Sequence, residues 1–191
     1  MKFKLFILLF IGCLALTAQV KKEQEFRIEG DEFPEIALKS LQPYFTDAKR
    51  IRFYKEFDGK KISYESKFKK DRLKYSVEFD SLGKLEDVEF IIREKDLPSE
   101  TWLTLQHYLG ANYENPKIKK IQQQYPLGNR STLQVLKAAF QNLLLPDINY
   151  ELIVSTKTKS GYVSYEITFD ANGNFLSTRK LVDPNYDHVL Y

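Results

Sequence analysis

The feature that most constrains the fold is a short stretch that occurs twice, from Tyr75 to Leu85 and again from Tyr165 to Phe175. In both copies apolar residues alternate with polar ones, and an Asp then stands three residues before a Gly. Alternation with a period of two is typical of a strand that buries one face. Asp at the start of a turn accepts backbone N–H bonds, and Gly tolerates the left-handed conformation that closes a hairpin. Each copy therefore predicts a strand, a tight turn and a returning strand, with the structural turn residues Asp80, Gly83, Asp170 and Gly173.

The repeat divides most of the chain into two units. Residues 33–94 predict a helix followed by an antiparallel β-meander, and residues 97–183 predict the same order with an extra helix inserted at 131–144. Each helix has one apolar stripe and each strand one apolar face, so a helix can cover one side of its meander and leave the other side polar and wet. The predicted fold class is α+β, with two tandem units whose meanders are either separate or joined into one long sheet.

Two local signals refine this plan. Ser131 and Gln134 form a capping-box pattern, which predicts the start of the inserted helix. The apolar residues of the strand that follows the first turn change face between Leu85 and Val88, and this predicts a β-bulge.

The N-terminus predicts export. Residues 1–18 begin with Lys2 and Lys4, continue with an apolar run and end with the small residue Ala18, which is the order of a secretory signal peptide. The run is too short for a good membrane span. Cleavage after Ala18 would give a periplasmic or secreted protein with no stable membrane span. An uncleaved anchor, and a lipoprotein acylated at Cys13, stay open as alternatives.

Outside the two units, residues 19–32 predict a flexible leader or one added edge strand, and residues 184–191 a short aromatic tail. Cys13 is the only cysteine, so the mature chain would have no disulfide, no thiol nucleophile and no thiolate metal site. The whole chain has 29 basic and 26 acidic residues, a balance that gives no electrostatic case for a nucleic-acid partner.

A helix that opens with an apolar residue and Pro34, followed by a meander that ends in Tyr-x-apolar-x-Phe-Asp-x-x-Gly, resembles the PepSY-like, β-lactamase-inhibitor-like (BLIP-like) family of exported bacterial proteins. The resemblance covers both units, and the helix at 131–144 interrupts the second. It implies that two tandem units can join into one sheet with helices on one face, which leaves the other face free to bind. It does not imply inhibition. The signal peptide, which ends in Thr17-Ala18-Gln19, resembles those of exported Bacteroidota proteins.

The sequence contains no pattern that predicts catalysis. His107 and His188 have no partner at a metal-ligand spacing, and no nucleophile elbow or phosphate-binding loop is present. Glu65 and Glu151 recur at corresponding positions and could form an acid–base pair, but ion pairing across strands with nearby lysines explains them more simply. We therefore predict a protein that is not an enzyme, with no catalytic residue, no cofactor and no metal.

Aromatic residues lead to a binding hypothesis. Tyr54 and Tyr162 fall on the predicted polar face of their strands, and tyrosine is favoured at binding surfaces. The leading hypothesis is a non-enzymatic exported binding module that engages an envelope or periplasmic protein or peptide through the open sheet face, with both tyrosines in contact. Most aromatics would otherwise fill two small cores. Two further hypotheses are a periplasmic carrier of a small apolar or anionic ligand, held between helix 131–144 and the sheet, and an enzyme of unfamiliar type.

Overall fold

The computed structural model describes residues 19–21, 23–159 and 161–181. The expected signal peptide, the alternative lipid site at Cys13 and the expected tail at 184–191 lie outside these residues. Within the described ranges, no helix is both long and apolar enough to cross a membrane.

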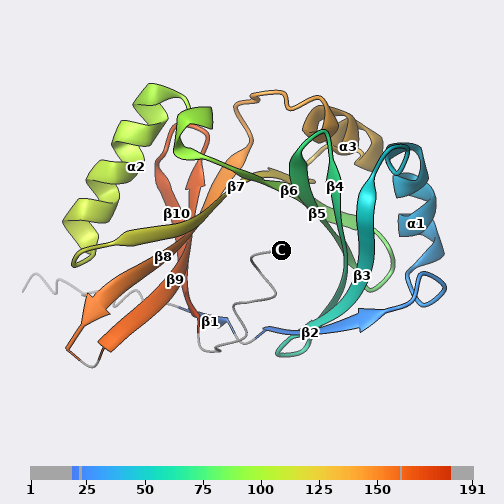
Figure 1. The fold of residues 1–191 in the computed structure, drawn as a ribbon, viewed down its shortest axis with the longest axis horizontal. Coiled ribbons are helices and arrows are strands. Elements are labelled where there is room, and N and C mark those ends of the chain that lie inside the picture. Colours follow the sequence, from blue (N-terminus) through green and yellow to red (C-terminus); the bar gives the residue numbers. More distant parts are fainter. Residues whose placement is uncertain (1–18, 22, 160, 182–191) are drawn as a thin grey trace, which may run out of the picture.

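All strands of the described residues belong to one sheet, and three α-helices pack on it (Figure 1). In spatial order the strands are β1 (Gln19–Lys21), β10 (Phe175–Leu181), β9 (Gly161–Asp170), β8 (Asn149–Thr158), β7 (Lys117–Pro126), β6 (Leu85–Ile92), β5 (Leu73–Asp80), β4 (Lys61–Lys70), β3 (Lys49–Asp58) and β2 (Glu23–Ile28). The helices are α1 (Glu35–Leu41), α2 (Ser99–Asn112) and α3 (Thr132–Phe140), with 3-10 turns at Gln42–Tyr44 and Glu94–Asp96.

The two predicted meanders form one continuous sheet. Strand β6 of the first meander pairs with β7 of the second, from Asp87 opposite Pro126 to Ile92 opposite Ile121. The nine strands β2 to β10 are antiparallel to their neighbours, and β1 adds to β10 in parallel. The predicted α+β class is therefore confirmed, as a nine-stranded antiparallel sheet with helices packed on it.

All three helices lie on the outer, convex side of the sheet (Figure 1). The apolar residues that alternate along the strands point to this side and are fully buried, as at Val77, Phe79, Ile167 and Phe169. One continuous core results, and its helical members are Ala37, Leu41, Leu105, Leu109, Val135, Leu136, Ala138 and Ala139. Since only one sheet face is covered, the alternate residues of every strand face the concave side.

The structure contains both the predicted β-bulge and the predicted capped helix, and the helix is shorter than predicted. Glu78 pairs with Asp87 and Phe79 with Leu85, so Glu86 is the extra residue of the predicted β-bulge. Ser131 and Gln134 cap α3 reciprocally. The helix ends at Phe140 rather than near 144, because Asn142 adopts a left-handed conformation with φ of 50° that closes the last turn.

The repeated turn also holds the helices on the sheet. Asp170 Oδ1 accepts from the backbone N–H groups of Asn172 and Asn174 at 2.9 and 2.8 Å, and Gly173 has φ of 86°. A Cβ atom at Gly173 would lie 2.8 Å from the carbonyl oxygen of Thr101 in α2. In the first copy a Cβ at Gly83 would lie 3.1 Å from Pro34, directly before α1. Each turn therefore contacts the start of a helix.

We expect Gly173→Ala to lower the free energy of unfolding by about 2–4 kcal/mol, because the added methyl group meets backbone as well as an unfavourable φ. Gly59→Ala is the matched control, since Gly59 has φ of 61° and nothing within 4 Å of the added Cβ. It should cost about 1 kcal/mol. Urea unfolding of both variants measures the difference, and equal losses would show that the turn does not pack on α2.

The N-terminal segment closes the sheet on itself. Residues 19–32, predicted as a flexible leader or one edge strand, instead contain β1 and β2, which lie at opposite ends of the strand order. Lys21 and Glu23 are separated by one residue in the chain, so their Cα atoms lie within about 7 Å of each other. The two end strands therefore follow each other directly, and Figure 1 shows β1 and β2 end to end between the two halves of the sheet.

A polar contact crosses the concave side. Arg179 of β10 donates two hydrogen bonds to Glu166 Oε1, at 2.8 and 2.6 Å, and a third to Asp58 Oδ2 of β3 at 3.3 Å. Strands β10 and β3 are seven steps apart in the sheet, which would separate them by about 34 Å if the sheet were flat. The sheet is consequently curled into a trough whose walls approach each other.

We expect Arg179→Ala to destabilise the protein by about 3 kcal/mol, because Glu166 is buried and loses its guanidinium partner. Asp58→Asn weakens only the contact across the trough and should cost less than about 1 kcal/mol. Urea unfolding of the two variants and of their combination gives the comparison. A loss at Arg179 no larger than the loss at Asp58 would contradict this assignment.

Candidate functional site

The concave face carries a row of acidic side chains on five neighbouring strands. Glu25 of β2 lies opposite Glu56 of β3, and Glu65 of β4 lies opposite Glu78 of β5, which in turn lies opposite Asp87 of β6. We call these five residues the carboxylate row. Like charges placed directly opposite each other destabilise a sheet, so the row requires either compensation or a function.

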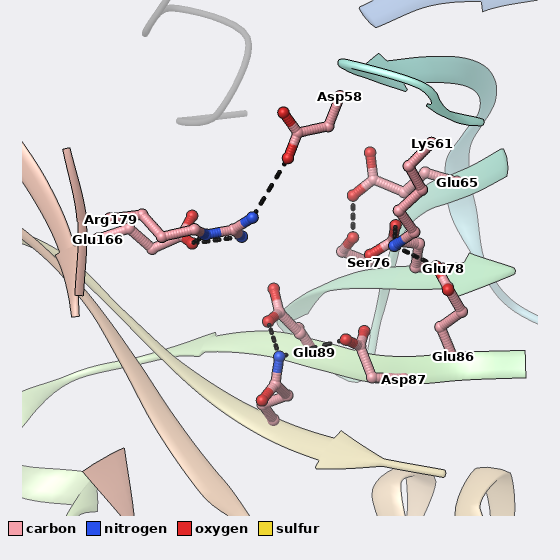
Figure 2. A network of polar contacts seen from close by, with 11 residues as sticks. Asp58, Lys61, Glu65, Ser76, Glu78, Glu86, Asp87, Glu89, Glu166 and Arg179 are labelled. Atoms are coloured by element: carbon pink, nitrogen blue, oxygen red, sulfur yellow. Dashed lines mark hydrogen bonds and ion pairs between the residues drawn. The ribbon is translucent and has the colours of Figure 1, made fainter. Parts of the chain in front are cut away.

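Two lysines compensate the row in part. Lys67 Nζ forms ion pairs with Glu25 and with Glu65 Oε2, the latter at 2.7 Å. Lys61 Nζ lies 3.1 Å from Glu78 and 2.6 Å from Glu86, the residue in the bulge. Figure 2 shows the members on β4, β5 and β6 pointing into the trough. Lys61 and Lys67 therefore pair with three of the five members of the row, Glu25, Glu65 and Glu78, and with Glu86 in the bulge.

Protonation reduces the remaining negative charge. Burial, reinforced by the charge of Glu65, raises the pKa of Glu56 well above its ordinary value. Burial also tends to raise the pKa of Glu65, but Lys67 and the hydrogen bonds from Glu56, Lys67 and Ser76 outweigh it and leave that pKa lowered. Of the two, Glu56 therefore keeps its proton to higher pH, and its carboxyl group is the one suited to donate to Glu65. Burial and the charge of Glu78 raise the pKa of Asp87 in the same sense.

The row makes stability depend on pH. The pKa values of Glu25, Glu56, Glu78 and Asp87 are raised in the folded protein, mainly by burial. A carboxyl group whose pKa is raised by folding stabilises the folded protein fully below the pKa that it has in the unfolded chain. This stabilisation is lost as pH rises through its pKa in the folded protein. Glu65 acts in the opposite sense, because its lowered pKa gives stability that is lost only at more acidic pH. Four members outweigh one, so stability should fall as pH rises from about 5 to 8.

We expect the wild-type melting temperature to be higher at pH 5 than at pH 8, and Glu56→Gln to reduce this difference. The substitution keeps a neutral donor beside Glu65, so it should raise the melting temperature at pH 8 by about 2–4 °C, which corresponds to about 1 kcal/mol. Glu29→Gln, at an exposed position outside the row, is the control. Calorimetry that gave Glu56→Gln the same pH profile as wild type would contradict the raised pKa of Glu56.

Amide side chains continue the polar face beyond the row. Gln124 donates to Asp87 Oδ2 at 3.2 Å and to Glu89 Oε1 at 2.9 Å, and it accepts from Asn149 at 3.0 Å. Gln122 donates to Glu89, and its own Oε1 is buried with no hydrogen-bond partner. The middle of the trough is therefore rich in acceptor oxygens, including one with no donor.

Three members of the row could hold a cation. Glu25, Glu56 and Glu65 each offer a carboxylate oxygen, and these atoms lie within 4.8 Å of one another. Lys67 contributes its ammonium group to the same cluster. The ammonium group of Lys67 thus occupies the place that a metal ion would take among these carboxylates. The absence of a metal site stays a prediction.

The structure places both predicted tyrosines on the face opposite the helices. Tyr54 of β3 is partly buried, and Lys67 Nζ lies 4.8 Å from the centre of its ring. Tyr54 therefore lies beside the lysine that pairs with the carboxylate row. Tyr162 of β9 is 64% exposed, and Lys117 Nζ lies 5.9 Å from its ring centre. The two residues lie on opposite halves of the sheet. Their role in binding stays a prediction.

Sequence reasoning placed the acidic residues on the correct face but misjudged their surroundings. Glu65 does pair with a lysine, Lys67, but along its own strand β4 rather than across strands, and Glu65 and Glu151 are both buried on a face that was expected to be wet. The curl of the sheet explains this difference, because the walls of a trough shield each other. His107 is exposed on α2, and His188 lies outside the described residues.

Comparison with known proteins places the fold. The scan against family models gave no match, and neither did the search of curated proteins. A DUF2874 family protein from Bacteroides ovatus is 12% identical with a TM-score of 0.52, over 83% of this chain and 97% of the other. A presumed periplasmic protein from Bacteroides eggerthii is 10% identical with a TM-score of 0.51, over 77% of this chain and 88% of the other. A BLIP-like protein from Bacteroides fragilis is 14% identical with a TM-score of 0.48, over 76% of this chain and 84% of the other.

These likenesses confirm the predicted resemblance at the level of the fold. The two likenesses with TM-scores above 0.5 show that the chain has the fold of a DUF2874 family protein and of a presumed periplasmic protein from Bacteroides.

Proposed function

We propose that this protein is an exported, non-enzymatic binding module whose concave face engages a basic segment of an envelope or periplasmic protein or peptide. The observation that carries the proposal is the carboxylate row, which runs across β2 to β6 and forms direct ion pairs with Lys61 and Lys67. A row of facing carboxylates costs stability in the free protein. Lysine or arginine side chains of a partner would relieve that cost.

The arrangement of the sheet favours contact through side chains rather than through strand addition. A peptide can extend a sheet only at an unpaired edge. Here, among the described residues, the end strands of the sheet are short, with three residues in β1 and six in β2, so their outer edges offer few backbone groups for pairing. The concave face, with its carboxylates, amides and Tyr54, is the larger polar surface that remains.

The packing of α3 disfavours the alternative of a ligand carried between that helix and the sheet. Val135, Leu136, Ala138 and Ala139 are buried in the core. Phe140, at the end of α3, stacks on Tyr44 with ring centres 4.2 Å apart. Protein side chains therefore fill the side of α3 that faces the sheet.

Fluorescence anisotropy with labelled peptides of equal length, one rich in lysine and arginine and one rich in aspartate and glutamate, tests the proposal. We expect binding of the basic peptide alone, with affinity that falls as salt is added. The pair Glu78→Gln and Asp87→Asn should weaken it by about tenfold, equivalent to about 1.4 kcal/mol, and Tyr54→Ala and Tyr162→Ala severalfold.

Glu29→Gln is the matched control, because it removes one exposed carboxylate outside the trough. Equal binding of the two peptides, or an effect of Glu29→Gln as large as that of the row variants, would refute binding through the concave face. If the basic peptide binds as expected, affinity purification from envelope extracts would identify the natural partner, with the Glu78→Gln, Asp87→Asn variant as the negative sample.

A further inference from the structure

We propose a second binding site, on the outer side of the sheet, for an amphiphile that carries an apolar chain and an anionic head group. An open groove with a volume of about 1060 Å³ lies between α2, the 3-10 turn at Glu94–Asp96 and the strands β6 and β7. Its size is at the upper end of the range of small-molecule sites in proteins. The proposal does not depend on the function of the concave face.

The floor and one wall of the groove are apolar. Leu97 and Ile121 are buried at its base, and Ile118 lies beside them, partly buried. Trp102 and Leu103 of α2 form the wall, and Leu103 is 65% exposed. A large apolar side chain left in water beside a tryptophan is an unfavourable arrangement that a bound apolar chain would relieve.

The rim of the groove is basic. Arg93, Lys95 and Lys119 line the groove on its outer side together with a single acidic residue, Glu94, and Arg93 is also paired with Asp96. Lys95 and Lys119 are exposed members of this rim and come from two different segments. The charge is opposite to that of the carboxylate row, so the two surfaces select different ligands. A neutral lipid or a cationic detergent would gain nothing from this rim.

The beginning of α2 adds a further feature that suits an anion. Its N-terminal residue Ser99 lines the groove, and Pro98 at the N-cap provides no side-chain hydrogen bond to the first turn. The free backbone N–H groups and the positive end of the helix dipole favour a carboxylate or phosphate nearby. Glu100, the acidic residue of the same turn, does not line the groove.

Trp102 allows a direct test, because it is the only tryptophan in the chain. We expect sodium laurate, below its micelle concentration, to change the fluorescence of Trp102 in a saturable manner. Dodecyltrimethylammonium, which has the same chain and a cationic head, should give no saturable change. The pair Lys95→Ala and Lys119→Ala should weaken laurate binding by about tenfold, and Lys137→Ala, an exposed lysine on α3, should leave it unchanged.

Two additional measurements separate the sources of such a ligand and guard against loss of folding. Thermal unfolding with and without laurate should show stabilisation of the wild type and of Lys137→Ala, and little of the Lys95, Lys119 pair. Vesicles of phosphatidylglycerol should not change the fluorescence if the ligand is a single amphiphile. A response to vesicles but not to laurate, equal responses to the two detergents, or no effect of the lysine variants would overturn the proposal.

Discussion

The curl of a single sheet is the constraint on which the rest of the structure depends. A flat sheet of this width would expose the polar face of every strand to water and would leave two free edges. Here residues 19–28 join the two ends, and Arg179 reaches from β10 to Asp58 on β3. The convex side then accommodates three helices, and the concave side becomes a trough in which carboxyl groups are buried.

Burial changes how strongly the charges on that face interact. On an open surface, ion pairs such as those of Lys61 and Lys67 would contribute little, because water screens them. In the trough, burial raises the pKa of Glu56, whereas Lys67 and hydrogen bonds keep the pKa of the neighbouring Glu65 below its ordinary value. Clusters of this kind often mark functional sites, since a fold gains no stability from facing like charges. The acidic interior and the basic, apolar groove beside Trp102 give the molecule two surfaces of opposite character.

Features set by neighbouring residues could be predicted from the sequence. The alternation at Val77 and Phe79, the turn at Asp170 to Gly173 and the cap at Ser131 all depend on residues a few positions apart. The cluster of Glu25, Glu56 and Glu65 could not be predicted, because its members meet only after the N-terminal segment has paired with β3. Alternation alone indicates which face a carboxylate occupies, whereas its burial depends on how far the sheet bends.

A distance measured across the trough in solution tests the curl directly. Cys13 is the only cysteine, within the expected signal peptide, so spin labels can be placed at two exposed positions, Lys60 and Lys180, by substitution to cysteine. These positions lie next to Asp58 and Arg179, so a curled sheet predicts a distance distribution centred below about 25 Å, whereas a flat sheet would place the strands about 34 Å apart. A main population beyond about 30 Å would contradict the closed sheet and the trough derived from it.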